Sequence, residues 1–126
     1  MRLLLDTNAL LWWLKDDKRL SSKARSAIAD PDNEIRASVI SIYELVYKAR
    51  AGKFPLGIAL ELEDHAAAAE IPWLSLEAPD MRTGASLEWD HKDPWDRLIA
   101  AQAISRRLSL VSSDRAFARA PVETIW

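Results

Sequence analysis

A chain of 126 residues with 49 % hydrophobic and 29 % charged residues is the size and composition of one folded domain, and three glycines exclude low complexity. The absence of cysteine excludes disulfides and thiolate metal sites, and a net charge of −2 provides no basic footprint for nucleic acid. The N-terminal apolar run stops at Asp6, too early for a signal peptide, and no stretch approaches the ~18 apolar residues of a membrane span. We therefore expect one cytoplasmic domain over residues 1–126, without membrane contact.

The first half of the chain alternates predicted strands and helices. Apolar residues recur at helical spacing from Ile42 until Gly52, which is typical of an amphipathic helix and its end. Asp6, Thr7 or Asn8 could cap the first helix. The elements expected before residue 42 are a strand over Arg2–Leu5, helices over Thr7–Lys15 and Ser22–Asp30, and a weak strand over Glu34–Ser38.

The second half contains the clearest helix start of the chain. Asp93 is an acidic cap, Pro94 takes the first helical position and Asp96 follows in the first turn, which predicts a helix to about Arg107. The other elements expected here are a helix over 58–69, a strand over Trp73–Leu76, a short helix over Pro79–Leu87, and strands over Leu108–Val111 and Val122–Ile125.

This alternation predicts an α/β fold with a parallel sheet of four or five strands flanked by helices. Ligands of such sheets bind outside the carboxyl ends of the strands. Asp6 and Asp114 each follow an apolar strand, so we expect both carboxylates at one edge of the sheet.

Four acidic residues have individually ordinary explanations. Asp6 and Asp114 could cap helices, Asp96 lies where acids favour the helix dipole, and Glu44 has Lys48 one turn later. Together the four map to the same sheet edge, where two carboxylates 4 Å apart repel by ~4 kcal/mol at an effective dielectric of 20. A cation would offset that cost, and oxygen-only ligands favour Mg²⁺ or Mn²⁺. Such an ion can activate a water for attack on a phosphodiester.

The chain resembles PIN domains, and more closely the VapC-type toxins of toxin–antitoxin modules. The late motif is the most specific part of a likeness that spans nearly the whole chain. The motifs that carry it are Leu4-Leu5-Asp6-Thr7-Asn8, Ser41-x-x-Glu44-Leu45, the run DPWDRLIAAQA from Asp93 to Ala103, and Leu110-Val111-Ser112-Ser113-Asp114.

The resemblance implies an endoribonuclease that uses Mg²⁺ or Mn²⁺ and is inhibited by a VapB-like antitoxin. Asp6, Glu44, Asp96 and Asp114 would form the metal-binding and catalytic quartet. Asn8 and Ser112 would orient the quartet by hydrogen bonds, although the family often has threonine at the second position. We expect Asp93 to cap its helix, and its carboxylate could also lie near the metal. We also expect a homodimer.

Two further features suggest contacts with partners. The run Ala9–Leu14 is apolar on every side, so it is either buried in the core or part of an interface with the antitoxin through Leu11, Trp12 or Trp13. Arg97 neighbours Asp96 and is a candidate for contact with the RNA backbone. His91, just before the acidic motif, is either a surface residue or a contact to substrate.

Three alternatives remain open at this stage. A PIN-type nuclease could act on DNA or flap substrates. A phospho-receiver domain has the same α/β architecture, but it would require an acidic pair after the first strand, where this chain has the single Asp6. A catalytically inactive interaction module would not need an intact quartet.

Overall fold

Five parallel strands form one sheet in the order β3-β2-β1-β4-β5, in a computed structural model that describes all residues 1–126. The sheet and its parallel pairing confirm the expected α/β fold. The strands are β1 (Arg2–Leu5), β2 (Glu34–Ser38), β3 (Trp73–Leu74), β4 (Ser109–Val111) and β5 (Thr124–Ile125).

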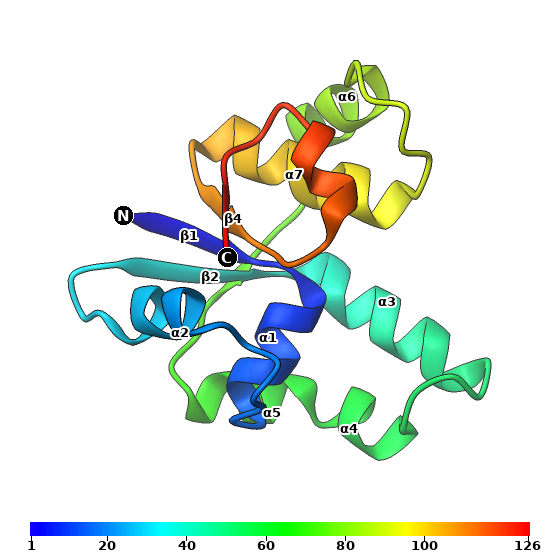
Figure 1. The fold of residues 1–126 in the computed structure, drawn as a ribbon. Coiled ribbons are helices and arrows are strands. Elements are labelled where there is room, and N and C mark those ends of the chain that lie inside the picture. Colours follow the sequence, from blue (N-terminus) through cyan, green and yellow to red (C-terminus); the bar gives the residue numbers. More distant parts are fainter.

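Helices cover both faces of the sheet (Figure 1), with α1 to α5 on one side and α6 and α7 on the other. They are α1 (Thr7–Leu14), α2 (Ser22–Ala29), α3 (Val39–Arg50), α4 (Leu56–Leu60), α5 (Leu62–Ala68), α6 (Ala78–Ser86) and α7 (Pro94–Arg106), followed by the 3₁₀ helix η1 (Arg115–Arg119). No helix has the length and apolar character needed to cross a membrane.

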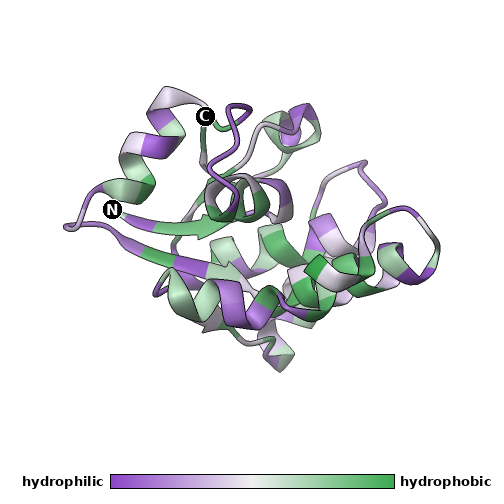
Figure 2. Cartoon of the chain, turned by 90° about the horizontal axis from the view of Figure 1, so that it is seen from below, coloured by the Kyte–Doolittle hydropathy of each residue, from purple (hydrophilic) through white to green (hydrophobic).

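The central strand β1 supplies side chains to two separate cores. Leu3 and Leu5 are buried against the layer of α1 to α5, whereas Leu4 is buried against α7. This alternation follows from the period of two residues in a strand. In Figure 2 the strand that begins at the N-terminus, β1, is hydrophilic at its start and hydrophobic over the rest of its length. A strand that is apolar on both faces is typical of a buried parallel sheet.

The structure changes several expected boundaries. The helix expected from Ile42 begins at Val39, because Ser38 at the end of β2 accepts a hydrogen bond from the backbone of Ile40 and caps α3 directly. The single helix expected over 58–69 is two helices, α4 and α5, separated at Glu61. Strands β3 and β5 are two residues each, since they are edge strands that pair on one side only.

The apolar run over residues 9–14 is only partly in the core. Leu11 is buried, but Trp12 and Trp13 are half-buried. The Trp12 ring packs 5.6 Å from that of Trp126 and lies under the guanidinium of Arg19. This surface therefore remains open to a partner.

Candidate active site

The register of the three central strands brings the residues after them to one edge of the sheet. Leu5 of β1 is opposite Ala37 of β2 and opposite Val111 of β4. The next backbone N–H, that of Asp6, donates to the carbonyl of Val111 over 3.1 Å. The chain segments that carry Asp6, α3 and residues 112–114 consequently leave the sheet side by side.

Asp6 is the most deeply buried acid of this edge, with 7 % of its surface exposed. Its Oδ1 accepts a hydrogen bond from the backbone of Ala9 over 2.8 Å and so caps α1. The pKa of Asp6 is raised to about 6, chiefly by burial and to a smaller extent by the nearby Asp96 and Asp114 carboxylates, whereas the Ser112 side chain and the hydrogen bond from Ala9 lower it. Asp6 is both a helix cap and an unneutralised carboxylate at the site.

Glu44 reaches the same edge from the second turn of α3 and is 9 % exposed. The Thr7 hydroxyl donates to its Oε1 over 2.9 Å and lies 2.9 Å from the Ser41 hydroxyl. The Lys48 ammonium pairs with the other carboxylate oxygen, as expected for residues one helical turn apart. Because Thr7 directly follows Asp6, it connects the two acidic side chains.

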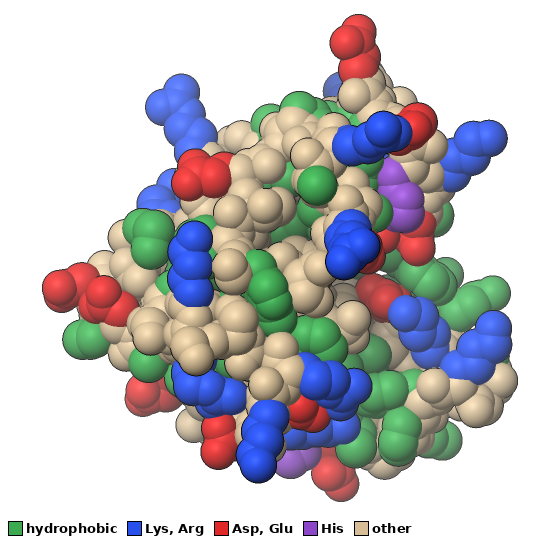
Figure 3. All heavy atoms as spheres, in the orientation of Figure 1, with side chains coloured by type: hydrophobic (Ala, Val, Ile, Leu, Met, Phe, Trp, Pro, Cys, Tyr) green, Lys and Arg blue, Asp and Glu red, His purple; other side chains and the backbone are tan.

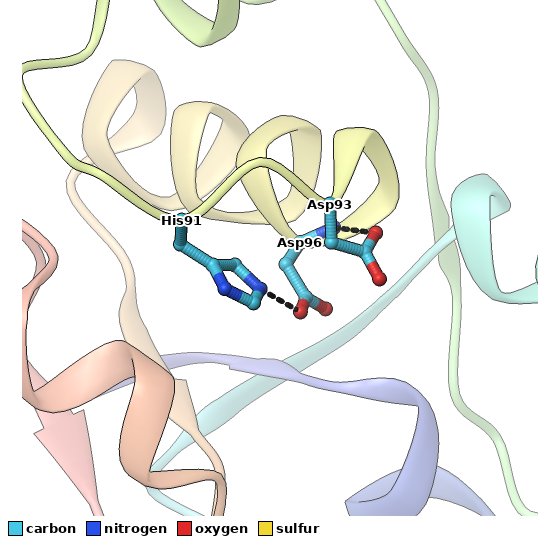
Figure 4. A group of neighbouring side chains, drawn as sticks. All are labelled: His91, Asp93 and Asp96. Atoms are coloured by element: carbon cyan, nitrogen blue, oxygen red, sulfur yellow. Dashed lines mark hydrogen bonds and ion pairs between the residues drawn. The ribbon is translucent and has the colours of Figure 1, made fainter.

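Asp96 lies in the first turn of α7, and its Oδ2 is 2.7 Å from His91 Nε2 (Figure 4). Burial is the largest cause that raises the pKa of Asp96, and the carboxylates of Asp93 and Asp114 raise it as well, while His91 lowers it. Asp93 Oδ1 accepts from the backbone N–H groups of Trp95 and Asp96 over 2.9 and 3.3 Å, which confirms that it caps α7.

Asp114 follows β4 at the rim of the site, where its side chain is exposed. Its backbone N–H donates to the buried Ser112 hydroxyl over 3.1 Å, and its Oδ1 accepts from Ala116 over 2.9 Å and caps η1. Ser112 thus positions Asp114 through the backbone, and its side chain lowers the pKa of Asp6.

Two expected side-chain roles differ from the structure. Asn8 is exposed and makes no hydrogen bond with the four acids, because in the first turn of α1 it is the buried Thr7 that faces Glu44. The Arg97 guanidinium is instead occupied within the protein, since it donates to backbone carbonyls at the end of α6 and in the loop that follows it. Those acceptors are Gly84, Leu87, Trp89 and His91, at 2.7–3.0 Å.

Three residues that lie beside the acids were not predicted as part of the site from the sequence. Thr7 lies within the motif already singled out, and its hydroxyl next to Asp6 was the available signal. His91 was considered for substrate but not as a partner of Asp96, and Lys48 only as a helix ion pair. Figure 3 shows acidic side chains and a histidine around a hollow between the α6–α7 layer and α3, with lysine and arginine side chains nearby.

The donors at this edge fit a hard divalent cation. They are carboxylate oxygens. Burial is the main cause of the raised pKa values of Asp6 and Asp96, and neighbouring carboxylates raise both values as well, so the charged forms are held here at a cost. Fold and site together define a class: a small α/β protein with an oxygen-rich acidic pocket at the carboxyl ends of parallel strands.

The chain belongs to the PIN domain family, whose model matches residues 3–123. Ribonuclease VapC22 of Mycobacterium tuberculosis is 32 % identical over 113 residues, which cover 89 % of this chain and 86 % of that protein.

Solved structures of low sequence identity share the fold. The VapBC2 structure from Rickettsia felis bound to a DNA fragment from its promoter has a chain that is 19 % identical, with a TM-score of 0.73 over 99 % of this chain and 98 % of that one. DNA-bound VapBC from Salmonella typhimurium gives 20 % identity and a TM-score of 0.74, with 99 % and 97 % coverage.

Proposed function

We propose that this protein is a metal-dependent endoribonuclease and the toxin of a type II toxin–antitoxin module. The observation that carries the proposal is the buried, like-charged group around Asp6, whose pKa is raised to about 6. Perturbed carboxylates of this kind concentrate at functional sites. The similarity to a ribonuclease of the VapC type supports RNA as the substrate.

Asp6, Glu44, Asp96 and Asp114 would hold Mg²⁺ or Mn²⁺, with Asp93 beside them. When bound, such an ion activates water and stabilises negative charge on a phosphodiester. The protein's own part is orientation. Thr7 fixes one oxygen of Glu44, Ser112 fixes the backbone of Asp114, and the caps of α1 and α7 hold Asp6 and Asp93.

Replacing Glu44 with Gln tests this function. The amide keeps the shape and still accepts from Thr7, but it removes a negative oxygen ligand. We expect cleavage of single-stranded RNA in Mn²⁺ to fall by more than ~100-fold, because loss of even an outer partner of a metal ligand costs ~10–100-fold. The assay compares RNA cleavage by both proteins with Mn²⁺ and with chelator.

Glu61→Gln is the matched control, because Glu61 is an exposed residue between α4 and α5. It should cleave like the wild type. Wild-type cleavage that persists in chelator would contradict metal dependence. Cleavage of DNA but not of RNA would replace the proposed substrate.

The antitoxin is proposed to bind the α1 surface, defined here as Leu11, Trp12, Trp13 and Leu14. Next to it, Leu11, Leu14, Ile58 and Leu62 line a hollow of about 240 Å³ between α1 and the α4–α5 pair. Half-buried tryptophans beside an apolar hollow are typical of an interface hot spot. The structural neighbours from VapBC complexes are consistent with such a partner.

Hydrogen exchange tests the antitoxin surface. In the complex with the product of the neighbouring gene, amides of residues 9–15 should exchange at least ~10-fold more slowly than in the free protein. The reason is that a bound partner suppresses the local unfolding through which the amides that it covers exchange with solvent. Amides of α6, on the opposite face, serve as the internal reference. Equal exchange of residues 9–15 in both samples would reject this surface.

The homodimer is proposed to form through the α3 face, defined as Val39, Ile42, Tyr43, Val46 and Tyr47. These residues and Arg50 line a hollow of about 540 Å³. The Tyr43 and Tyr47 rings stack 6.2 Å apart and both pack against the Trp95 ring, and Tyr47 is 58 % exposed. A contiguous exposed apolar patch of this kind marks an interaction site.

Tyr47→Asp should convert a dimer into a monomer, because an added charge in a desolvated apolar interface cannot be paired. Sedimentation or light scattering should give twice 14.2 kDa for the wild type and 14.2 kDa for the variant. Leu60→Asp is the control, since Leu60 on α4 is also an exposed apolar residue, at 60 %, outside this face. A monomeric wild type would exclude the dimer.

A further inference from the structure

His91 is held against the acidic site by a loop without regular secondary structure, between α6 and α7. We infer that its Nε2 is a nitrogen ligand of the ion at the acidic site and makes that site prefer Mn²⁺ over Mg²⁺. The inference rests on the proposed metal-dependent function and adds a residue outside the acidic quartet.

The donor atoms lie close to the spacing of ligands around one ion. His91 Nε2 lies 2.7 Å from Asp96 Oδ2, and one ligand atom each from His91, Asp93 and Asp96 lie within 4.8 Å of one another. Neighbouring ligands of an octahedral ion with bonds of ~2.1 Å are about 3.0 Å apart, and opposite ligands about 4.2 Å. An ion can therefore replace the contact between His91 and Asp96 after shifts of a few tenths of an ångström.

Free oxygens complete this donor set. Asp93 uses Oδ1 for both backbone hydrogen bonds of the cap, and its Oδ2 accepts none. Asp96 contacts His91 through Oδ2 alone. In Figure 4 the His91 ring and the two carboxylates extend from the loop and the helix start toward the same side. One oxygen on each aspartate thus stays available while the cap and the loop remain intact.

The His91 ring is held in place on two sides. It packs 4.8 Å from the Trp89 ring, and the buried Trp89 packs 5.5 Å from Phe117. The carbonyl groups of Trp89 and His91 both accept from one Arg97 nitrogen, at 2.7 and 3.0 Å. A ligand fixed in this way loses less conformational freedom when it binds a metal.

His65, the other histidine of the chain, lacks the aromatic packing and the loop contacts that hold His91. It is exposed on α5, and its nearest acidic partner, Glu61, is 3.6 Å away. The chain has only these two histidines. His65 is therefore a matched control for any signal that histidine nitrogen gives.

A nitrogen ligand changes which ion the site prefers. Imidazole suits transition metals, whereas Mg²⁺ favours carboxylate, carbonyl and water oxygens and dehydrates reluctantly. The ratio of Mn²⁺ affinity to Mg²⁺ affinity should therefore be larger for the site with His91 than for the same site without it. A histidine that only positioned Asp96 would not produce this difference.

Electron spin echo envelope modulation of bound Mn²⁺ tests the inference directly, because it detects a coordinated ¹⁴N nucleus. We expect histidine ¹⁴N modulation in the wild type and in His65→Gln. In His65→Gln, ¹⁵N-labelled histidine marks His91 alone. This labelling should replace the histidine ¹⁴N modulation with that of ¹⁵N. This arm does not require any change at His91.

His91→Gln supplies the second measurement, since a glutamine amide can still donate to Asp96 but offers no imidazole nitrogen. We expect the ratio of Mn²⁺ to Mg²⁺ affinity to fall about tenfold, within the ~10–100-fold range for altered metal surroundings. Titration of each ion into metal-free wild type, His91→Gln and His65→Gln measures this ratio.

The outcomes separate this inference from the proposed function. Mn²⁺ that binds and supports RNA cleavage without histidine modulation would overturn the role of His91 and leave the function standing. An unchanged affinity ratio in His91→Gln would overturn it as well. A wild type that binds neither ion would overturn both.

Discussion

Asp6→Asn is expected to abolish RNA cleavage while leaving the metal-free protein at least as stable as the wild type at neutral pH. The variant removes one charge from a buried group of carboxylates at nearly constant shape. Most substitutions destabilise a protein by ~1 kcal/mol, so this site would be an exception. The cap of α1 should survive, because asparagine caps as well as aspartate.

The sign of the pH dependence follows from the raised pKa of Asp6. Its folded-state pKa of about 6 exceeds its ordinary value of 3.8, so the folded state holds the proton more tightly. The resulting stabilisation is full below the ordinary pKa and is lost as pH rises through about 6. A shift of about two pKa units corresponds to ~3 kcal/mol. The wild type should therefore lose stability relative to Asp6→Asn between about pH 4 and pH 6.

Denaturant unfolding in chelator across this pH range, with RNA cleavage at neutral pH, measures both effects. Excess Mn²⁺ should raise the melting temperature of the wild type much more than that of Asp6→Asn, because a ligand that binds only the folded state stabilises it. Asp32→Asn, in an exposed turn, is the matched control. An Asp6→Asn protein that melts several degrees lower in chelator would mean that Asp6 is chiefly structural.

Arg97→Lys is expected to lower the free energy of unfolding by about 3 kcal/mol, because hydrogen bonds to charged groups contribute ~1.5–3 kcal/mol each. One guanidinium holds four carbonyls at 2.7–3.0 Å, and a single ammonium cannot span them. Gly84 also brings α6 close to α7, where an added Cβ would lie 3.2 Å from Leu98. Loss of the Arg97 contacts should therefore loosen both the loop and this helix pair.

Activity should fall together with stability in Arg97→Lys, since the released loop carries His91 next to Asp96. Melting curves should show a decrease of roughly 10 °C for a loss of this size. Arg82→Lys is the control, because Arg82 is exposed on α6 and makes no hydrogen bond through its side chain. A stable Arg97→Lys protein that has lost only RNA affinity would instead favour the backbone contact inferred from the sequence.

Local sequence patterns predicted most of the architecture. Strands β1 and β2 have the expected bounds, and Asp93 and Pro94 correctly predicted the start of α7. These features could be predicted because caps and strand ends depend on neighbours within a few residues. The rule that parallel strands share a carboxyl edge was enough to place Asp6 and Asp114 together. Boundaries were less accurate where a helix starts directly from a strand, as α3 does after Ser38.

The partners that reach the acidic side chains from distant parts of the chain were decided by tertiary structure. Thr7 meets Glu44 across 37 positions of sequence, and this contact depends on how α3 packs beside β1. Arg97 reaches the carbonyls of α6 and the following loop because α6 packs closely on α7. The sequence by itself was enough to propose which residues carry the chemistry and to predict at which edge of the sheet they lie. Only the packing of helices on that sheet determined which hydrogen bonds orient them, because side-chain contacts between distant segments have no local signature.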